Sequence, residues 1–93
     1  MAKIDVSTSE WDDGYQFEVT VQEGGSQSRH SVTLKKTDYE RLTGGEASPE
    51  DLVTESFRFL LEREPKESIL SSFDLTVISR YFPEYDREIK TRL

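Results

Sequence analysis

The sequence predicts one small α+β domain over residues 1–93, in which a three-stranded antiparallel meander of order 1-2-3 has one face covered by helices. Apolar and polar residues alternate along 15–22, which is typical of a half-buried strand. Glycine-containing turn signals flank this strand on both sides. Ser48-Pro49 follows as a helix start signal and opens an amphipathic stretch.

The second and third strands are expected to pair through a two-residue turn at Gly24-Gly25. This turn places Phe17 opposite Val32 and Val19 opposite His30, so the apolar residues of the two strands share one face. The pairing therefore predicts a sheet with one apolar side.

A second turn signal, Asp13-Gly14, joins the first strand to the second. A turn at these two residues predicts Val6 opposite Val21, which keeps the apolar residues of the first strand on the shared face. A meander of this size needs helices to cover that face.

Helical segments supply the cover. Residues 37–40, Thr-Asp-Tyr-Glu, have the pattern of a capping box and predict a short helix that ends at Gly44-Gly45. Ser48 as N-cap, with Pro49 in the first helical position, predicts the main helix over 49–64. Its apolar residues fall on one stripe, which consists of Leu52, Val53, Phe57, Leu60 and Leu61.

The segment 75–82 fits two structures. Leu75, Ile78 and Phe82 align at helical spacing, whereas the β-branched residues between them also suit a strand, which would add a fourth strand to the sheet. We expect a helix over about 74–82, capped by Asp74 or Ser72 and followed by a further helical turn after Pro83.

Charge and cysteine content restrict the partners and the compartment. Twelve Lys and Arg against 19 Asp and Glu give a net charge of −7, whereas a nucleic-acid binder is expected to carry the opposite balance. Nucleic acid is therefore a disfavoured partner. The absence of cysteine favours a cytoplasmic protein, and the absence of a long apolar run predicts a soluble chain without a signal peptide or a membrane span.

The residue inventory is poor in catalytic groups. The chain has one histidine, no cysteine and no glycine-rich phosphate loop. We expect His30 to be a core residue with a local hydrogen bond, and the carboxylates lack the spacing of a calcium loop. The sequence therefore predicts no enzyme, no catalytic residue, no metal or cofactor site and no small-molecule substrate.

Two features are candidate partner-binding sites. Trp11 lies beside the first turn and, by strand parity, on the face opposite the core, where an exposed Trp can anchor a partner. The alternative is that it covers the sheet edge. The second feature is the segment 80–87, which is rich in the residue types found at interface centres, with Arg80, Tyr81, Tyr85 and Arg87 as its candidate contacts. Its aromatic rings can equally close the end of the core.

One short motif is similar to a known family. Gly14-Tyr15 followed by Val19 fits the Gly-Tyr-x-x-x-Val pattern at the start of the second strand of HicB-type antitoxins, and the order of three strands and a helix resembles those domains in outline. The resemblance covers about twenty residues. The Pro-Gly-Cys segment usual in that family is absent, so no functional residue is transferred.

Two functions follow as hypotheses. The first is a non-catalytic module for binding a protein partner or for self-association. The alternative is a small antitoxin-like regulator that acts on nucleic acid or within a nucleic-acid complex. In this case the helix near 74–82 and the basic C-terminal residues contact phosphates, and the acidic surface faces away. Salt dependence distinguishes the two hypotheses, because phosphate contacts weaken steeply as salt rises.

Overall fold

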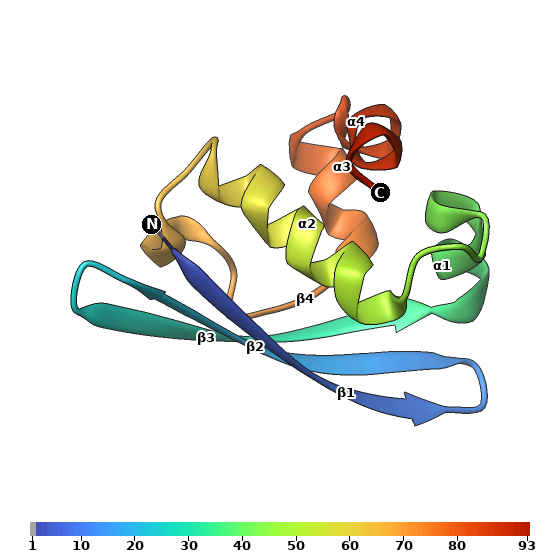
Figure 1. The fold of residues 1–93 in the computed structure, drawn as a ribbon, viewed down its shortest axis with the longest axis horizontal. Helices are drawn as coiled ribbons and strands as arrows, with labels where there is room; N and C mark the ends of the chain where they lie inside the picture. Colours follow the sequence, from blue (N-terminus) through green and yellow to red (C-terminus); the bar gives the residue numbers. More distant parts are fainter. Residues whose placement is uncertain (1) are drawn as a thin grey trace.

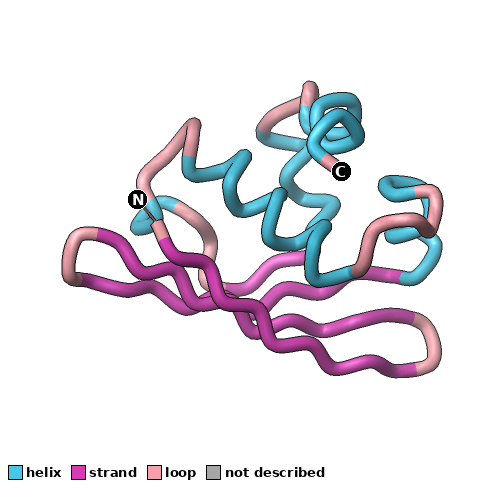
Figure 2. Tube along the Cα trace, viewed as in Figure 1, coloured by secondary structure: helices cyan, strands magenta, loops and turns pink. Residues whose placement is uncertain are grey.

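The computed structural model describes residues 2–93, and in it a four-stranded sheet has its helices on one face (Figures 1 and 2). The sheet runs in the order β1-β2-β3-β4 and consists of β1 (Lys3–Trp11), β2 (Gly14–Glu23), β3 (Ser26–Lys35) and β4 (Ser72–Asp74). The α-helices are α1 (Lys36–Thr43), α2 (Pro49–Leu61), α3 (Ile78–Tyr81) and α4 (Tyr85–Arg92). Two 3-10 turns complete the fold, η1 (Lys66–Ser68) and η2 (Leu75–Val77). The α+β class and the three-stranded meander are confirmed.

The predicted register of β2 and β3 is confirmed. Phe17 pairs with Val32 and Val19 pairs with His30 in an antiparallel ladder. Gly24 and Gly25 form the turn, both with positive φ (62° and 82°), a conformation that glycine adopts without a steric penalty.

The predicted register of β1 and β2 is wrong by two residues. Val6 lies opposite Val19, not Val21, because the turn consists of Asp12 and Asp13. Gly14 belongs to β2, where a Cβ would lie 2.5 Å from the carbonyl oxygen of Leu34. Gly14 is therefore required for close strand approach, and the shift by two leaves the apolar residues of β1 on the same face.

The helix signals are confirmed for α2 and corrected for α1. The hydroxyl of Ser48 accepts a hydrogen bond from the backbone N–H of Asp51 (3.0 Å), and Pro49 occupies the first turn. The helix ends at Leu61, three residues earlier than expected. In α1 the predicted capping box does not form, because the helix already begins at Lys36, directly after β3, without a side-chain cap. Gly44 ends α1 in the left-handed conformation, as expected.

The C-terminal segment contains both a strand and a helix. β4 pairs in parallel with β3, with Val32 opposite Phe73, and precedes the segment for which a helix was expected. Asp74 then accepts a hydrogen bond from the N–H of Thr76 (3.1 Å), which confirms it as the cap of the helical segment that runs through η2 and α3. Pro83 separates α3 from α4.

The core lies between the sheet and the helices that cover it. It is formed by apolar side chains of β2, β3, α1, α2 and the C-terminal segment, with β1 contributing partly buried residues at its edge. Phe57 and Phe59 of α2 are both fully buried, so the helix contributes more than the single stripe that the sequence predicts. Figure 1 shows α2 lying across the sheet, with α3 and α4 beside α2 on the same face of the sheet.

Candidate binding site

The residues predicted to contact a partner lie in different environments. Tyr81 on α3 is 67% exposed, and Arg80 beside it is also exposed. Arg87 lies on the exposed side of α4. Trp11 is 45% exposed at the end of β1, where its parity directs it to the face of the sheet that carries no helices. The structure therefore does not bring Trp11 together with the residues of α3.

Tyr85 has to be removed from the predicted partner-binding set, because it is fully buried. Its ring lies edge-on to Phe59, with 5.3 Å between the centroids, and its hydroxyl forms a 2.6 Å hydrogen bond with Ser56. Burial accordingly raises the pKa of the Tyr85 phenol. Pro83 interrupts the helix between Tyr81 and Tyr85, so the two rings do not share a surface.

A half-open apolar pocket lies at the C-terminal end of α2. Its walls come from that end of α2, the chain between α2 and β4, Phe73 of β4, and η2 with α3. Its volume is about 440 Å³, within the range of binding pockets. We call it the α2–α3 pocket, and its apolar lining consists of Leu60, Ile69, Leu70, Phe73, Val77, Ile78, Tyr81 and Phe82.

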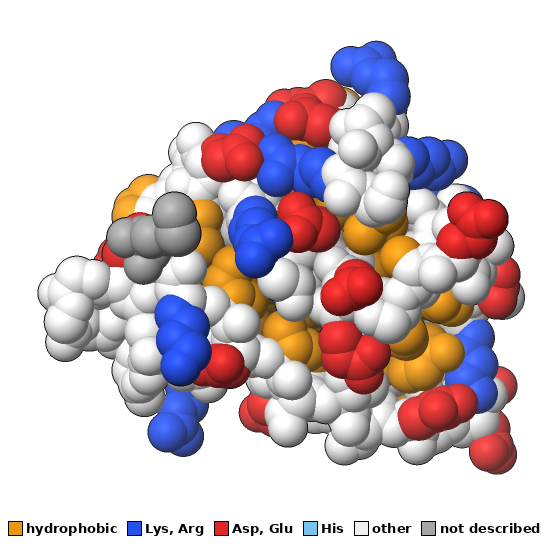
Figure 3. Space-filling view, in the orientation of Figure 1, with side chains coloured by type: hydrophobic (Ala, Val, Ile, Leu, Met, Phe, Trp, Pro, Cys, Tyr) orange, Lys and Arg blue, Asp and Glu red, His pale blue; other side chains and the backbone are white. Residues whose placement is uncertain are grey.

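Two unusually exposed side chains lie at this pocket. Four large apolar side chains in residues 2–93 are strongly exposed: Trp11, Leu70, Tyr81 and Leu93. Leu70 (47% exposed) and Tyr81 both line the α2–α3 pocket. On the face shown in Figure 3, acidic and basic side chains are interspersed, and apolar side chains show mainly between them. Exposed apolar side chains beside an apolar pocket are typical of a binding surface, because a partner that covers them removes apolar area from water.

His30 holds the pocket wall in place. The Nδ1–H of its buried imidazole donates a 2.7 Å hydrogen bond to the carbonyl oxygen of Leu70. A carbonyl can only accept, so Nδ1 carries the proton, and in the neutral ring Nε2 accepts from the hydroxyl of Ser28 at 2.8 Å. The prediction of a core histidine opposite Val19 is confirmed, and one of its two hydrogen bonds is local.

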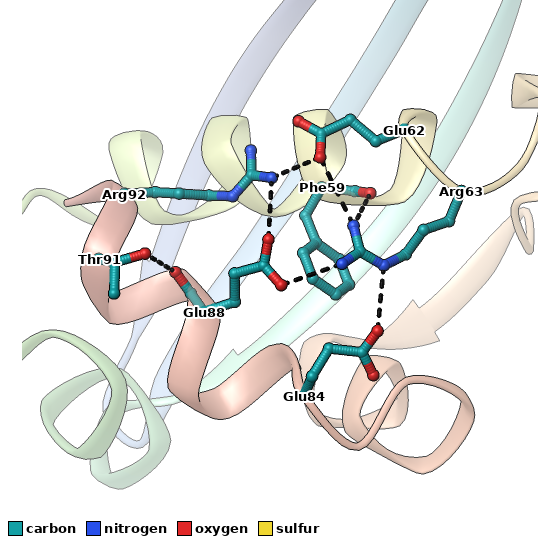
Figure 4. A network of polar contacts seen from close by, with 7 residues as sticks. All are labelled: Phe59, Glu62, Arg63, Glu84, Glu88, Thr91 and Arg92. Carbon is teal, nitrogen blue, oxygen red and sulfur yellow. Dashed lines mark hydrogen bonds and ion pairs between the residues drawn. The ribbon is translucent and has the colours of Figure 1, made fainter.

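A network of charged groups fixes α4 against α2 (Figure 4). Arg63 donates hydrogen bonds to Glu84 (3.3 Å), Glu88 (3.0 Å) and the carbonyl oxygen of Phe59 (3.1 Å). Its guanidinium lies 3.5 Å from the centroid of the Phe59 ring. Arg92 bonds Glu62 at 2.6 Å, and this bond holds the pKa of that carboxyl below its ordinary value.

Glu64 differs from these neighbours. It is partly buried in the wall of the α2–α3 pocket, where its carboxylate makes no hydrogen bond or ion pair with residues 2–93. Burial raises the pKa of this carboxyl, since the apolar surroundings disfavour the charged form. Apart from Glu64 and Ser68, the lining of the pocket is therefore apolar, and Glu64 is its one charged side chain.

Both ring nitrogens of His30 are occupied by hydrogen bonds within the protein. In the described part of the chain, no three His, Cys, Asp or Glu side chains cluster as metal ligands do. Between Ala2 and Leu93, no helix is long and apolar enough to cross a membrane.

Comparisons of the chain with known protein families, with curated proteins and with solved structures find no match. The antitoxin-like outline of the sequence therefore remains a prediction. The sequence predicts Tyr81, but not Leu70 or Glu64, as part of a site. The apolar pair Ile69-Leu70, in an otherwise polar stretch between α2 and β4, is the signal that points to this segment.

Proposed function

We propose that this protein is a non-catalytic, cytoplasmic interaction module that binds a segment of a protein partner in the α2–α3 pocket. The observation that carries the proposal is the position of Leu70 and Tyr81, two exposed apolar side chains that line one apolar pocket. Covering them removes apolar surface from water, which is the main driving force of protein association.

A protein partner of different charge fits better than a second copy of the chain. The net charge of −7 makes two copies repel each other. The charge of Glu64, which has no partner in the pocket, also favours a basic partner over an acidic one.

The nucleic-acid alternative is less well supported. Three of its basic residues, Arg80, Arg87 and Lys90, are exposed, but the net charge of −7 repels phosphates. Arg92 is engaged by Glu62 and Glu88 within the protein. Arg63 is likewise neutralised by Glu84 and Glu88. Binding to a nucleic acid would fall steeply with salt, and we expect binding at the α2–α3 pocket to change little between low and moderate salt.

Selection of random displayed dodecapeptides on the immobilised protein tests the proposal. We expect selected peptides to bind the wild type and the variant Leu93→Asp equally, and to lose at least tenfold in affinity for Leu70→Asp. Leu93 is the matched control because it is 41% exposed and lies outside the pocket. Peptides that bind all three proteins equally would show that the pocket is not the docking site.

A further inference from the structure

The inference rests on the proposed function and concerns the chemistry of the partner. We propose that the partner segment places an apolar side chain in the α2–α3 pocket and an adjacent Lys or Arg against Glu64. The pocket thus selects a basic-apolar motif, with Glu64 as the counter-ion of the bound cation.

The lining of the pocket provides the first argument. Apart from Glu64 it consists of apolar side chains and Ser68, so Glu64 is the one lining residue with a formal charge. Leu70 and Tyr81 offer apolar surface beside it. A partner group that suits both parts of this lining has an apolar body and a positively charged end.

The pairing of the neighbouring glutamates provides the second argument. Every other glutamate of the stretches 62–67 and 84–92 has a cationic partner within the described chain: Glu62 with Arg92, Glu67 with Lys66, and Glu84 and Glu88 with Arg63. Glu64 has none, although Arg63 directly precedes it. Arg63, Lys66 and Arg92 are therefore already engaged, and the charge of Glu64 has no counter-ion within residues 2–93.

The environment of Glu64 provides the third argument. A carboxylate in apolar surroundings lacks part of its hydration, and here burial is the cause that raises its pKa. An arriving ammonium or guanidinium compensates for that loss by direct attraction to the carboxylate. An arriving carboxylate would be repelled for the same reason, and a neutral group would leave the charge uncompensated.

Three pools of capped hexapeptides test this inference. Each has a fixed Leu followed by Lys, Gln or Glu, and the other positions are drawn from Gly, Ser and Leu. Binding is followed by the NMR shifts of the methyl groups of Leu70, Val77 and Ile78, which line the pocket. At neutral pH we expect the Leu-Lys pool to bind about fivefold to tenfold more tightly than the Leu-Gln pool, as for a net gain of about 1–1.4 kcal/mol. The Leu-Glu pool should bind most weakly.

Two variants assign the preference to Glu64. In Glu64→Gln the Leu-Lys and Leu-Gln pools should bind within about twofold of each other. Glu46→Gln, which alters an exposed glutamate outside the pocket, should keep the wild-type preference and so excludes an effect of net charge alone.

The outcomes separate the two proposals. If no pool shifts the pocket methyl groups, the pocket is not a docking site and the proposed function fails with this inference. If all pools shift them equally, the docking site stands and the cation preference is refuted. A preference for Leu-Lys that survives in Glu64→Gln would also refute the role of Glu64.

Discussion

The imidazole of His30 on β3 and the backbone carbonyl of Leu70 are joined by a 2.7 Å hydrogen bond across 40 positions of sequence. This bond ties the chain between α2 and β4 to the sheet. It thereby fixes the exposed side chain of Leu70 in the wall of the α2–α3 pocket.

The variant His30→Phe tests this connection. It keeps an aromatic ring in the core but leaves the carbonyl of Leu70 and the hydroxyl of Ser28 without their partner. We expect a loss of about 1–3 kcal/mol in the free energy of unfolding, measured by urea denaturation. Ser28→Ala removes only the bond to Nε2 and should lose less; equal losses would show that the bond to Leu70 contributes nothing.

Truncation of the two tyrosines of the C-terminal segment should affect stability very differently. Tyr85→Ala should cost about 3–5 kcal/mol, because it removes a fully buried ring from its contact with Phe59. Tyr81→Ala should stay within about 0.5 kcal/mol of the wild type while weakening peptide binding, since its side chain is mostly exposed. Circular dichroism melts measure the change in stability of both variants. Similar melting temperatures for the two variants would contradict the assignment of Tyr85 to the core.

Gly14 should tolerate substitution less well than the turn glycines. Gly14→Ala brings a Cβ to 2.5 Å from a backbone oxygen, so β2 and β3 must move apart, at about 1–3 kcal/mol or more. Gly24→Ala meets no atom within 4 Å and suffers only from its positive φ, at about 1–2 kcal/mol. Loss of amide protection along β3 in Gly14→Ala, but not in Gly24→Ala, would identify the strand contact as the cause.

Arg63 should contribute more to stability than another arginine of the same region. Arg63→Ala removes the hydrogen bonds to Glu84 and Glu88, the ion pair with Glu62 and the stacking on Phe59, and we expect a loss of about 1–3 kcal/mol. Arg58→Ala removes an exposed pair with Glu55 and should lose less than about 0.5 kcal/mol. Chemical denaturation of both variants measures the difference, and equal losses would mean that the network in Figure 4 does not fix α4.

Glu64→Gln should stabilise the protein at neutral pH. Burial raises the pKa of this carboxyl above its ordinary 4.5, so the wild type loses stability as the pH rises through that range, whereas glutamine does not titrate. Melting temperatures of the variant and the wild type should coincide near pH 3 and separate towards pH 7. Glu62→Gln should have the opposite sign at pH 7, because the bond to Arg92 lowers the pKa of Glu62. A Glu64→Gln variant that is less stable at pH 7 would imply an ionic partner within the protein.

Local patterns predicted most of the fold. The diglycine turn determined the pairing of Phe17 with Val32, and the Ser48-Pro49 signal determined the start of α2, because each depends only on backbone preferences of adjacent residues. The Asp13-Gly14 signal misplaces the first hairpin, because Gly14 belongs to β2 and the turn consists of Asp12 and Asp13. The actual role of Gly14, close approach to Leu34 on another strand, has no local signature.

The candidate site was harder to predict, because it depends on contacts between distant segments. Tyr81 could be identified from composition, but the burial of Tyr85 depends on Phe59 and Ser56 of a different helix. β4 has only three residues and pairs with a strand far earlier in the chain, so it gives no periodic pattern. The lack of a partner for Glu64 can be recognised only once every neighbouring arginine is placed.

The parallel pairing of β4 with β3 also has a consequence for the folding pathway. β1, β2 and β3 are linked by two tight turns, and hairpins of this kind form within about 1–10 μs. β4 reaches β3 only after the chain from 36 to 71 has returned to the sheet, and closing so long a loop is entropically more costly. We therefore expect the meander to form before β4 joins it, so that the edge of β3 stays open to pairing with other chains in that interval.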